Sequence, residues 1–172
     1  PLIIFLALLL PSILVGSQPT IPAIYKWLKL AELAGFSWWI KSNVDWRKHL
    51  PNISLALSGS ILFQSVLAIF QWLKQGSLFD YWFLGEQPYN TATLGMDKIT
   101  WFNGALKLPP LGTTPHPNVL AGLIVVLLPL ALQVRNLKIK IVTITLAVSA
   151  LFLTFSLSAW LALLLIIVPY FI

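Results

Sequence analysis

The segment Gly112–Asn118 holds the residues best suited to chemistry, because it places His116 between two prolines directly before an apolar run. Pro117 is expected to open a helix, since the first helical turn needs no N–H from that residue. His116 and Asn118 would then lie among free backbone N–H groups, which attract anions. Two interpretations stay open: an outward-facing corner that binds phosphate or transfers a proton, and a capped helix entry with an interfacial histidine.

A polar stripe runs along the apolar segment from 51 to 73. On one helical face, at about 100° per residue, lie Ser60, Gln64, Gln71 and Gln75, with Lys74 adjoining. A glutamine that faces lipid is unfavourable, so this face should meet protein or a water-filled cavity. The stripe therefore indicates either hydrogen bonding between helices or part of a path for a polar substrate.

Two further polar positions have both a functional and a structural interpretation. Glu32 is the one acid inside an expected span, which makes it a functional hypothesis, but Lys29 one turn earlier also fits a simple ion pair. Ser156 lies in a small-residue break between apolar runs, where serine more often forms turns and caps than it catalyses. With no cysteine and only two distant histidines, we expect no metal site and no cofactor.

The composition indicates the environment in which these residues must work. Of the 172 residues, 58% are hydrophobic and 9% are charged, against about 45–50% and about 25% in an average globular domain. A soluble domain of this size could not bury so much apolar surface. The net charge of +6 comes from basic residues that fall mostly between apolar runs, which suits membrane topology better than nucleic-acid binding.

We therefore expect an all-α, polytopic transmembrane helical bundle with about six spans. A span needs about 20 mostly apolar residues. Residues 1–172 would form a single transmembrane domain that continues beyond both ends of this sequence. The expected spans are Pro1–Ser17, Ile21–Ile40, Pro51–Leu73, Pro117–Val134, Ile139–Phe155 and Ser158–Ile172.

The loops between these spans predict the orientation of the chain. Residues 41–50 hold three cations against one acid, and residues 135–140 hold three cations and no acid, so both should be cytoplasmic. Residues 74–116 hold three acids against three lysines and form the long outer loop. Within that loop, Asn103-Gly104 between β-prone runs predicts a short hairpin with positive φ at both turn residues.

The second half of the chain also carries a family resemblance. The stretch Gly112-Thr113-Thr114-Pro115-His116-Pro117-Asn118-Val119-Leu120-Ala121-Gly122 resembles the GTF-x-HPN-x-LAG motif of the O-antigen ligase/polymerase superfamily. Residues 153–161 resemble that family's LT-x-SR-x-AWL landmark. Gln71, Leu84-Gly85-Glu86 and the hairpin also resemble its bacterial branch. The resemblance covers about residues 60–172.

The resemblance implies a bacterial enzyme of the cytoplasmic membrane that transfers or polymerises glycan from an undecaprenyl diphosphate carrier onto an acceptor at the outer leaflet. It implies no nucleotide or metal. The catalytic residues are expected beyond Ile172, so this stretch alone should be inactive. The family's diphosphate-binding arginines correspond to Pro109 and Leu157. The expected substrate-binding residues are Lys107, Thr113, His116, Asn118 and Ser156.

Two other classes of function remain open. A transporter or flippase for a lipid-linked or small substrate would use Glu32, Gln64 and Gln71 as a path through the membrane. A non-catalytic membrane scaffold would be consistent with the missing arginines.

Overall fold

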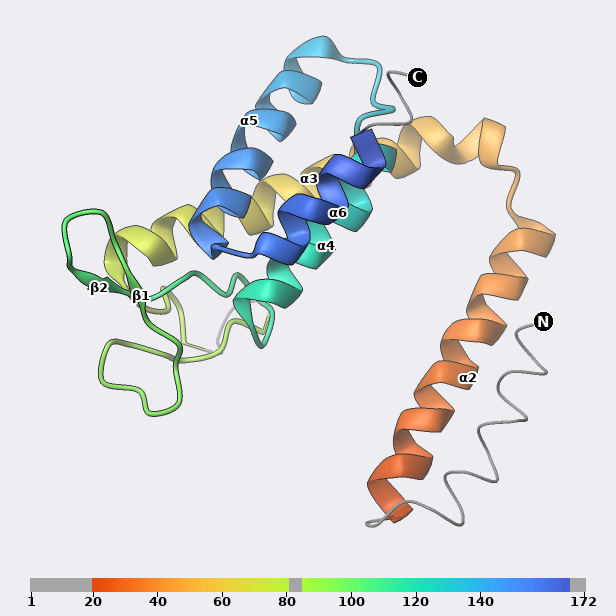
Figure 1. The fold of residues 1–172 in the computed structure, drawn as a ribbon. Coiled ribbons are helices and arrows are strands. Elements are labelled where there is room, and N and C mark those ends of the chain that lie inside the picture. The colour runs from red at the N-terminus through yellow and green to blue at the C-terminus, as the bar shows by residue number, and fades with distance from the viewer. Residues whose placement is uncertain (1–19, 81–84, 168–172) are drawn as a thin grey trace. The chain divides into compact units, whose positions relative to one another are not determined.

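A computed structural model describes residues 20–80 and 85–167 of the chain (Figure 1). The chain divides into two compact units, Pro1–His49 and Leu50–Ile172, and each is described by itself. The expected span Pro1–Ser17 lies outside the described residues, as does Leu84 of the segment that resembles the family's bacterial branch.

The first unit contains helix α2, Thr20–Asn43, which covers the expected span Ile21–Ile40. Glu32 and Lys29 form an exposed ion pair at 2.8 Å between Oε2 and Nζ. This contact is the simple ion pair that the sequence offered as an alternative to a functional role of Glu32. Near the end of the unit, the Asp45 carboxylate accepts a hydrogen bond from the Arg47 N–H at 3.0 Å. This bond satisfies a donor in the first turn of the next helix.

The second unit packs its helices around α4. Its helices are α3 (Trp46–Lys74, which begins in the first unit), α4 (Pro117–Ala131), α5 (Leu137–Thr154) and α6 (Leu157–Ile167). The core contains large side chains of α4, among them Leu120, Ile124 and Leu128, together with small residues of the neighbouring helices. Those small residues are Ala68, Ala147, Ala150 and Ala159. They let helix backbones approach closely, as at membrane helix interfaces.

The prediction of about six spans is corrected by the lengths and charges of these helices. Within the described residues there are five helices, and α3 and α5 alone are long and apolar enough to cross a membrane. With its 15 residues, α4 extends about 22 Å, short of a hydrocarbon core of about 30 Å. Helix α6 has 11 residues, and α2 carries charged residues along its length. The buried core helix of a soluble protein meets the same length and composition test as α3 and α5.

The predicted hairpin is present, but its turn differs from the expected one. Strands β1 (Ile99–Thr100) and β2 (Leu106–Lys107) pair antiparallel, with Ile99 opposite Lys107. Gly104 has φ +79°, whereas Asn103 is not among the described non-glycine residues with positive φ. The Gly104 N–H instead donates to the Trp101 carbonyl at 2.8 Å. The loop is therefore longer than the predicted two-residue turn, with glycine alone supplying the left-handed position.

The loops of the second unit lie at opposite ends of its helices. At one end, the Ser58 hydroxyl of α3 donates to the Ala131 carbonyl, the last residue of α4. At the other end, the last turns of α3 lie beside the segment that enters α4, and Trp72 of α3 packs on Phe155, the residue that ends α5. Residues 75–80 and 85–116 and the turn at Ser156 thus share one end, and the α4–α5 connection lies at the other (Figure 1).

Candidate functional site

The loop that enters α4 is held by a row of amide side chains on α3. We call residues 108–116 the helix-entry loop, and Gln64, Gln71 and Gln75 the glutamine face. Gln64 accepts from the Thr113 N–H at 3.0 Å and donates to the Thr113 hydroxyl at 2.6 Å. Gln75 accepts from the Leu108 N–H at 2.9 Å. The predicted polar stripe therefore meets protein, although Ser60 at its other end is exposed.

Gln71 is the centre of this arrangement and is fully buried. Its side-chain oxygen accepts from the N–H groups of Leu111 and Gly112 at 3.1 and 2.7 Å. Its NH₂ group donates to the Gly112 carbonyl at 2.9 Å and to the Glu86 carboxylate at 2.6 Å. The amide thus makes four hydrogen bonds, two as acceptor and two as donor, which is the full number for a glutamine side chain.

Glu86 is a buried carboxylate that is held by hydrogen bonds. Besides Gln71, the backbone N–H groups of Leu78 and Phe79 donate to its two oxygens at 2.7 and 2.6 Å. A buried charge is costly unless it is paired or hydrogen-bonded. Glu86 therefore connects the chain just after α3 to the glutamine face. Nearby, burial raises the pKa of the Tyr89 phenol above its usual value.

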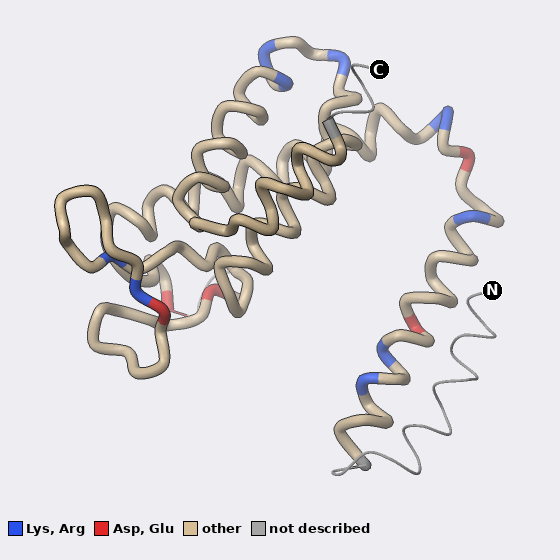
Figure 2. The backbone as a smooth tube through the Cα atoms, viewed as in Figure 1, with Lys and Arg blue, Asp and Glu red and all other residues tan. Residues whose placement is uncertain are grey.

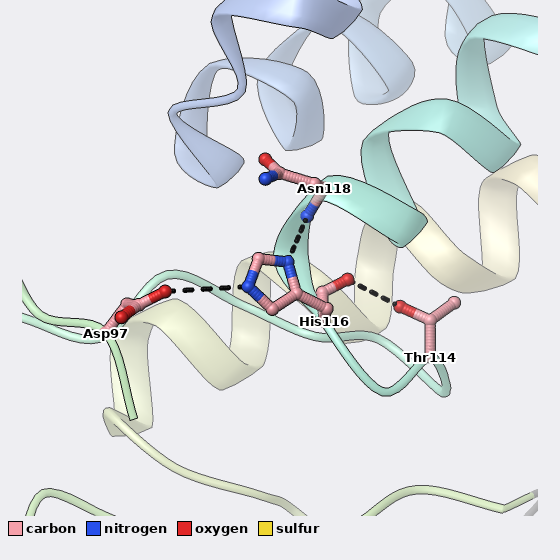
Figure 3. A network of polar contacts seen from close by, with 4 residues as sticks. All are labelled: Asp97, Thr114, His116 and Asn118. Carbon is pink, nitrogen blue, oxygen red and sulfur yellow. Dashed lines mark hydrogen bonds and ion pairs between the residues drawn. The ribbon is translucent and has the colours of Figure 1, made fainter. Parts of the chain in front are cut away.

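His116 is the N-cap of α4, with extended backbone at φ −154° and ψ 146°. Its Nδ1 accepts from the Asn118 N–H at 3.1 Å, and its Nε2 lies 3.5 Å from the Asp97 carboxylate (Figure 3). Because Nδ1 is an acceptor, the ring proton of the neutral imidazole must be on Nε2. The Thr114 hydroxyl lies 3.0 Å from the His116 carbonyl and fixes the turn before the helix.

A small cavity of about 80 Å³ opens beside His116. Met96, Asp97, Leu111 and Pro115 line it together with the histidine. Both the imidazole and the Asp97 carboxylate are largely exposed, at 47% and 81% of their side-chain surface. An anionic ligand at Nε2 would have to replace the Asp97 carboxylate, and the exposure of Asp97 leaves it free to turn into solvent.

Not all of the predicted binding residues meet at this corner. His116 and Asn118 are in contact, whereas Thr113 is held by Gln64. Lys107 places its Nζ over the Trp72 ring at 5.8 Å from the ring centre. The described contacts do not join Lys107 to His116. Ser156 is buried and lies 3.2 Å from the Ser158 hydroxyl, in the predicted turn between α5 and α6.

Two residues of the site were not predicted from their own spacing. Asp97 is distant from His116 in the sequence and follows no helical or strand period with it. Glu86 was noted only within the segment that resembles the family. The signal that could have found Glu86 is its position as an acid in an aromatic, apolar stretch, since an acid that is buried there needs hydrogen-bond donors.

This arrangement can present an oriented, neutral imidazole and the N-terminus of α4 to one ligand. The dipole of a helix favours negative charge at its N-terminus by about 0.3–1 kcal/mol. Within residues 20–80 and 85–167, no group of three His, Cys, Asp or Glu side chains converges as metal ligands would. The chemistry available at this corner is therefore hydrogen bonding to an anion or proton transfer through Nε2.

We predict that Gly112→Ala destabilises the helix-entry loop. Gly112 has φ +59°, and a Cβ there would lie 2.9 Å from Leu120 Cδ1 and press on the Gln64 side-chain oxygen. Gly104→Ala is the matched control, because Gly104 also has positive φ but has nothing within 4 Å of its Cβ position. In the control, the free energy of unfolding should fall by about 1–2 kcal/mol because of the left-handed backbone alone. In Gly112→Ala it should fall by about 1–3 kcal/mol more because of overpacking, as measured by chemical unfolding in detergent. Equal losses would show that the tight packing has no energetic weight.

Comparison with protein-family models, with curated proteins and with solved structures finds no match for this chain.

Proposed function

We propose that this chain is part of a multi-pass protein of the bacterial cytoplasmic membrane that resembles the O-antigen ligases and polymerases. It would transfer or polymerise glycan from an undecaprenyl diphosphate carrier at the outer leaflet. The observation that carries the proposal is the helix-entry loop. Gly112 and Thr113, which open the stretch that resembles the family's motif, are held by the glutamine face, and His116 in the same stretch caps α4. A dianionic leaving group is stabilised by preorganised hydrogen-bond donors, such as the N-terminus of a helix.

The exposed surface of α3 and α5 supports the membrane part of the proposal. In their most apolar 18-residue windows, 39% and 28% of the residues are buried inside the protein. Large side chains such as Phe70, Ile141 and Phe152 are about half exposed. So much outward apolar surface on two long helices suits contact with lipid tails.

The contacts of the glutamine face favour a transferase over a transporter. A polar path through the membrane would need Gln64 and Gln71 to face a water-filled cavity. Their amide groups are instead taken up by the helix-entry loop. Glu32 is engaged with Lys29.

We predict that the two loop ends of the second unit lie on opposite sides of the membrane. The chain has no cysteine, so single cysteines report their own position. Leu94→Cys, at a residue that is 96% exposed, should react with an impermeant maleimide in intact spheroplasts. Leu137→Cys, at a residue that is 66% exposed, should react only after the membrane is permeabilised. Labelling of both sites in intact spheroplasts would contradict a membrane crossing between them.

The proposed reaction is tested with the full-length protein in proteoliposomes that hold an undecaprenyl diphosphate-linked glycan. We expect release of undecaprenyl diphosphate that depends on a glycan acceptor and on no added metal or nucleotide. Movement of the intact donor between leaflets without cleavage of the glycan–phosphate bond would instead identify a flippase. If neither release nor movement is observed, a scaffold role remains and the proposal is contradicted.

A further inference from the structure

An apolar groove lies at the end of the second unit far from the helix-entry loop. It has a volume of about 360 Å³, within the range of about 300–1,000 Å³ typical of ligand pockets. Its lining comes from the end of α4 and the two residues after Ala131, from the first two thirds of α5 and from the last turns of α6. The principal lining residues are Leu128, Leu132, Ile144, Val148, Leu163 and Lys140. The lining residues are thus apolar apart from Lys140 and Gln133.

The charge around Lys140 has one sign. Arg135, Lys138 and Lys140 occupy the connection from α4 into α5, and no acid follows Asp97 in the sequence. Figure 2 shows the acids of the second unit gathered near the outer loop, with basic residues alone at the opposite end. Lys140 is half-buried, while Arg135 and Lys138 are exposed. Three cations without a nearby acid favour an anionic partner.

The geometry of α5 matches an amphipathic ligand. From Lys140 to Val148, both of which line the groove, the helix rises about 12 Å. A ligand with an anionic head at Lys140 would therefore have its apolar tail along Ile144 and Val148. Asn136 holds the start of α5 in place, because its side chain accepts from the Lys138 and Ile139 N–H groups at 2.9 and 3.3 Å.

The lining also distinguishes a lipid from another helix as the occupant. Helix contacts in membranes are rich in small residues, and in this unit Ala147, Ala150 and Ala159 are buried in the helix core. The groove instead presents Leu, Ile, Val and Pro side chains. Such a surface can accommodate a flexible acyl chain without close approach of two backbones.

We propose that this groove is a binding site for an anionic phospholipid of the cytoplasmic leaflet, with its phosphate at Lys140 and with Arg135 and Lys138 adding positive charge in the neighbouring α4–α5 connection. Basic pockets between membrane helices on the cytoplasmic side bind anionic headgroups in this way. The proposal rests on the membrane placement of the second unit but not on glycan transfer, so it can hold if the protein transfers no glycan.

The test measures lipid binding to the purified full-length protein by native mass spectrometry in detergent. Each cation near an anionic headgroup strengthens binding by about fivefold. Phosphatidylglycerol should therefore bind at least tenfold more tightly than phosphatidylcholine, even if the three cations do not all contribute fully. Lys140→Gln should weaken phosphatidylglycerol binding about fivefold. The matched control is Lys98→Gln, which removes an exposed lysine at the other end of the unit and should leave binding unchanged.

A second variant tests the groove itself. Ile144→Trp fills the apolar channel and should reduce binding of phosphatidylglycerol at least tenfold while Lys140 remains in place. If that variant does not fold, the Lys140→Gln result still decides. Equal binding of the two lipids by the wild type, no binding of either, or binding that Lys140→Gln leaves unchanged would each overturn the proposal. No binding would also be the result if another helix or a second copy filled the groove.

Discussion

Gln71→Ala is expected to destabilise the second unit by about 3–5 kcal/mol. The substitution leaves the N–H groups of Leu111 and Gly112, the Gly112 carbonyl and one Glu86 oxygen without their Gln71 partner. Each buried polar group that loses its partner costs about 1–3 kcal/mol. The total is lower than the simple sum because Glu86 keeps two backbone donors and because water can enter the space.

The measurement is the free energy of unfolding of the variant in detergent, followed by near-ultraviolet circular dichroism. Trp72 and Trp101 should contribute to the near-ultraviolet signal, since their rings pack on each other at 4.9 Å between ring centres. Gln75→Ala is the matched control. Gln75 is half-buried and makes one long-range hydrogen bond, to the Leu108 N–H, so it should lose about 1 kcal/mol. A Gln71→Ala loss no larger than that of the control would show that the glutamine face does not hold the loop.

A charged isostere separates the acceptor and donor roles of Gln71. Gln71→Glu keeps an oxygen for the Leu111 and Gly112 N–H groups but loses the NH₂ group that donates to Glu86. The new carboxylate would lie at hydrogen-bond distance from the Glu86 carboxylate, and two buried like charges repel strongly. Gln71→Glu should therefore be at least as destabilising as Gln71→Ala.

The sequence predicted the local features of this fold well. The apolar runs predicted helices over most of α2 to α6, and Pro117 predicted the first residue of α4. The polar spacing also predicted that Gln64, Gln71 and Gln75 share one face. These features depend on residues close together in the chain, where helical period and capping chemistry act directly.

What the sequence could not predict depends on distant partners. Gln71 and Gly112 are 41 residues apart, and no periodic pattern connects them. The pairing of His116 with Asp97 and of Lys107 with Trp72 is likewise set by how the chain between α3 and α4 folds back. The count of about six spans was wrong because each apolar run was taken as a membrane-spanning helix, whereas α4 and the described part of α6 are too short to span.

The second large effect is expected at His116 in the full-length protein. If the Nε2–H donates to a diphosphate oxygen in the proposed reaction, its removal loses a charge-assisted hydrogen bond of about 1.5–3 kcal/mol. That loss corresponds to a decrease of about tenfold to a hundredfold in kcat/KM. The same side chain also caps α4 through Nδ1, so a simple truncation would mix the two roles.

His116→Asn separates these roles. Asparagine is among the best N-cap residues, so its side-chain oxygen can accept from the Asn118 N–H in place of Nδ1. The variant should therefore keep the stability of the wild type. Its short side chain cannot extend to the position of Nε2 near Asp97. His116→Ala should lose both roles, with about 1 kcal/mol of stability lost from the missing cap.

The measurement that tests the central claim most directly is kcat/KM for glycan transfer from an undecaprenyl diphosphate-linked donor by full-length wild type, His116→Asn and His116→Ala. Amounts of folded protein in the membrane should be matched. The proposed contact with the donor predicts a decrease of about tenfold to a hundredfold in both variants, with His116→Asn as stable as the wild type. Wild-type kcat/KM in His116→Asn would contradict the claim, and would show that this corner of the protein only caps α4.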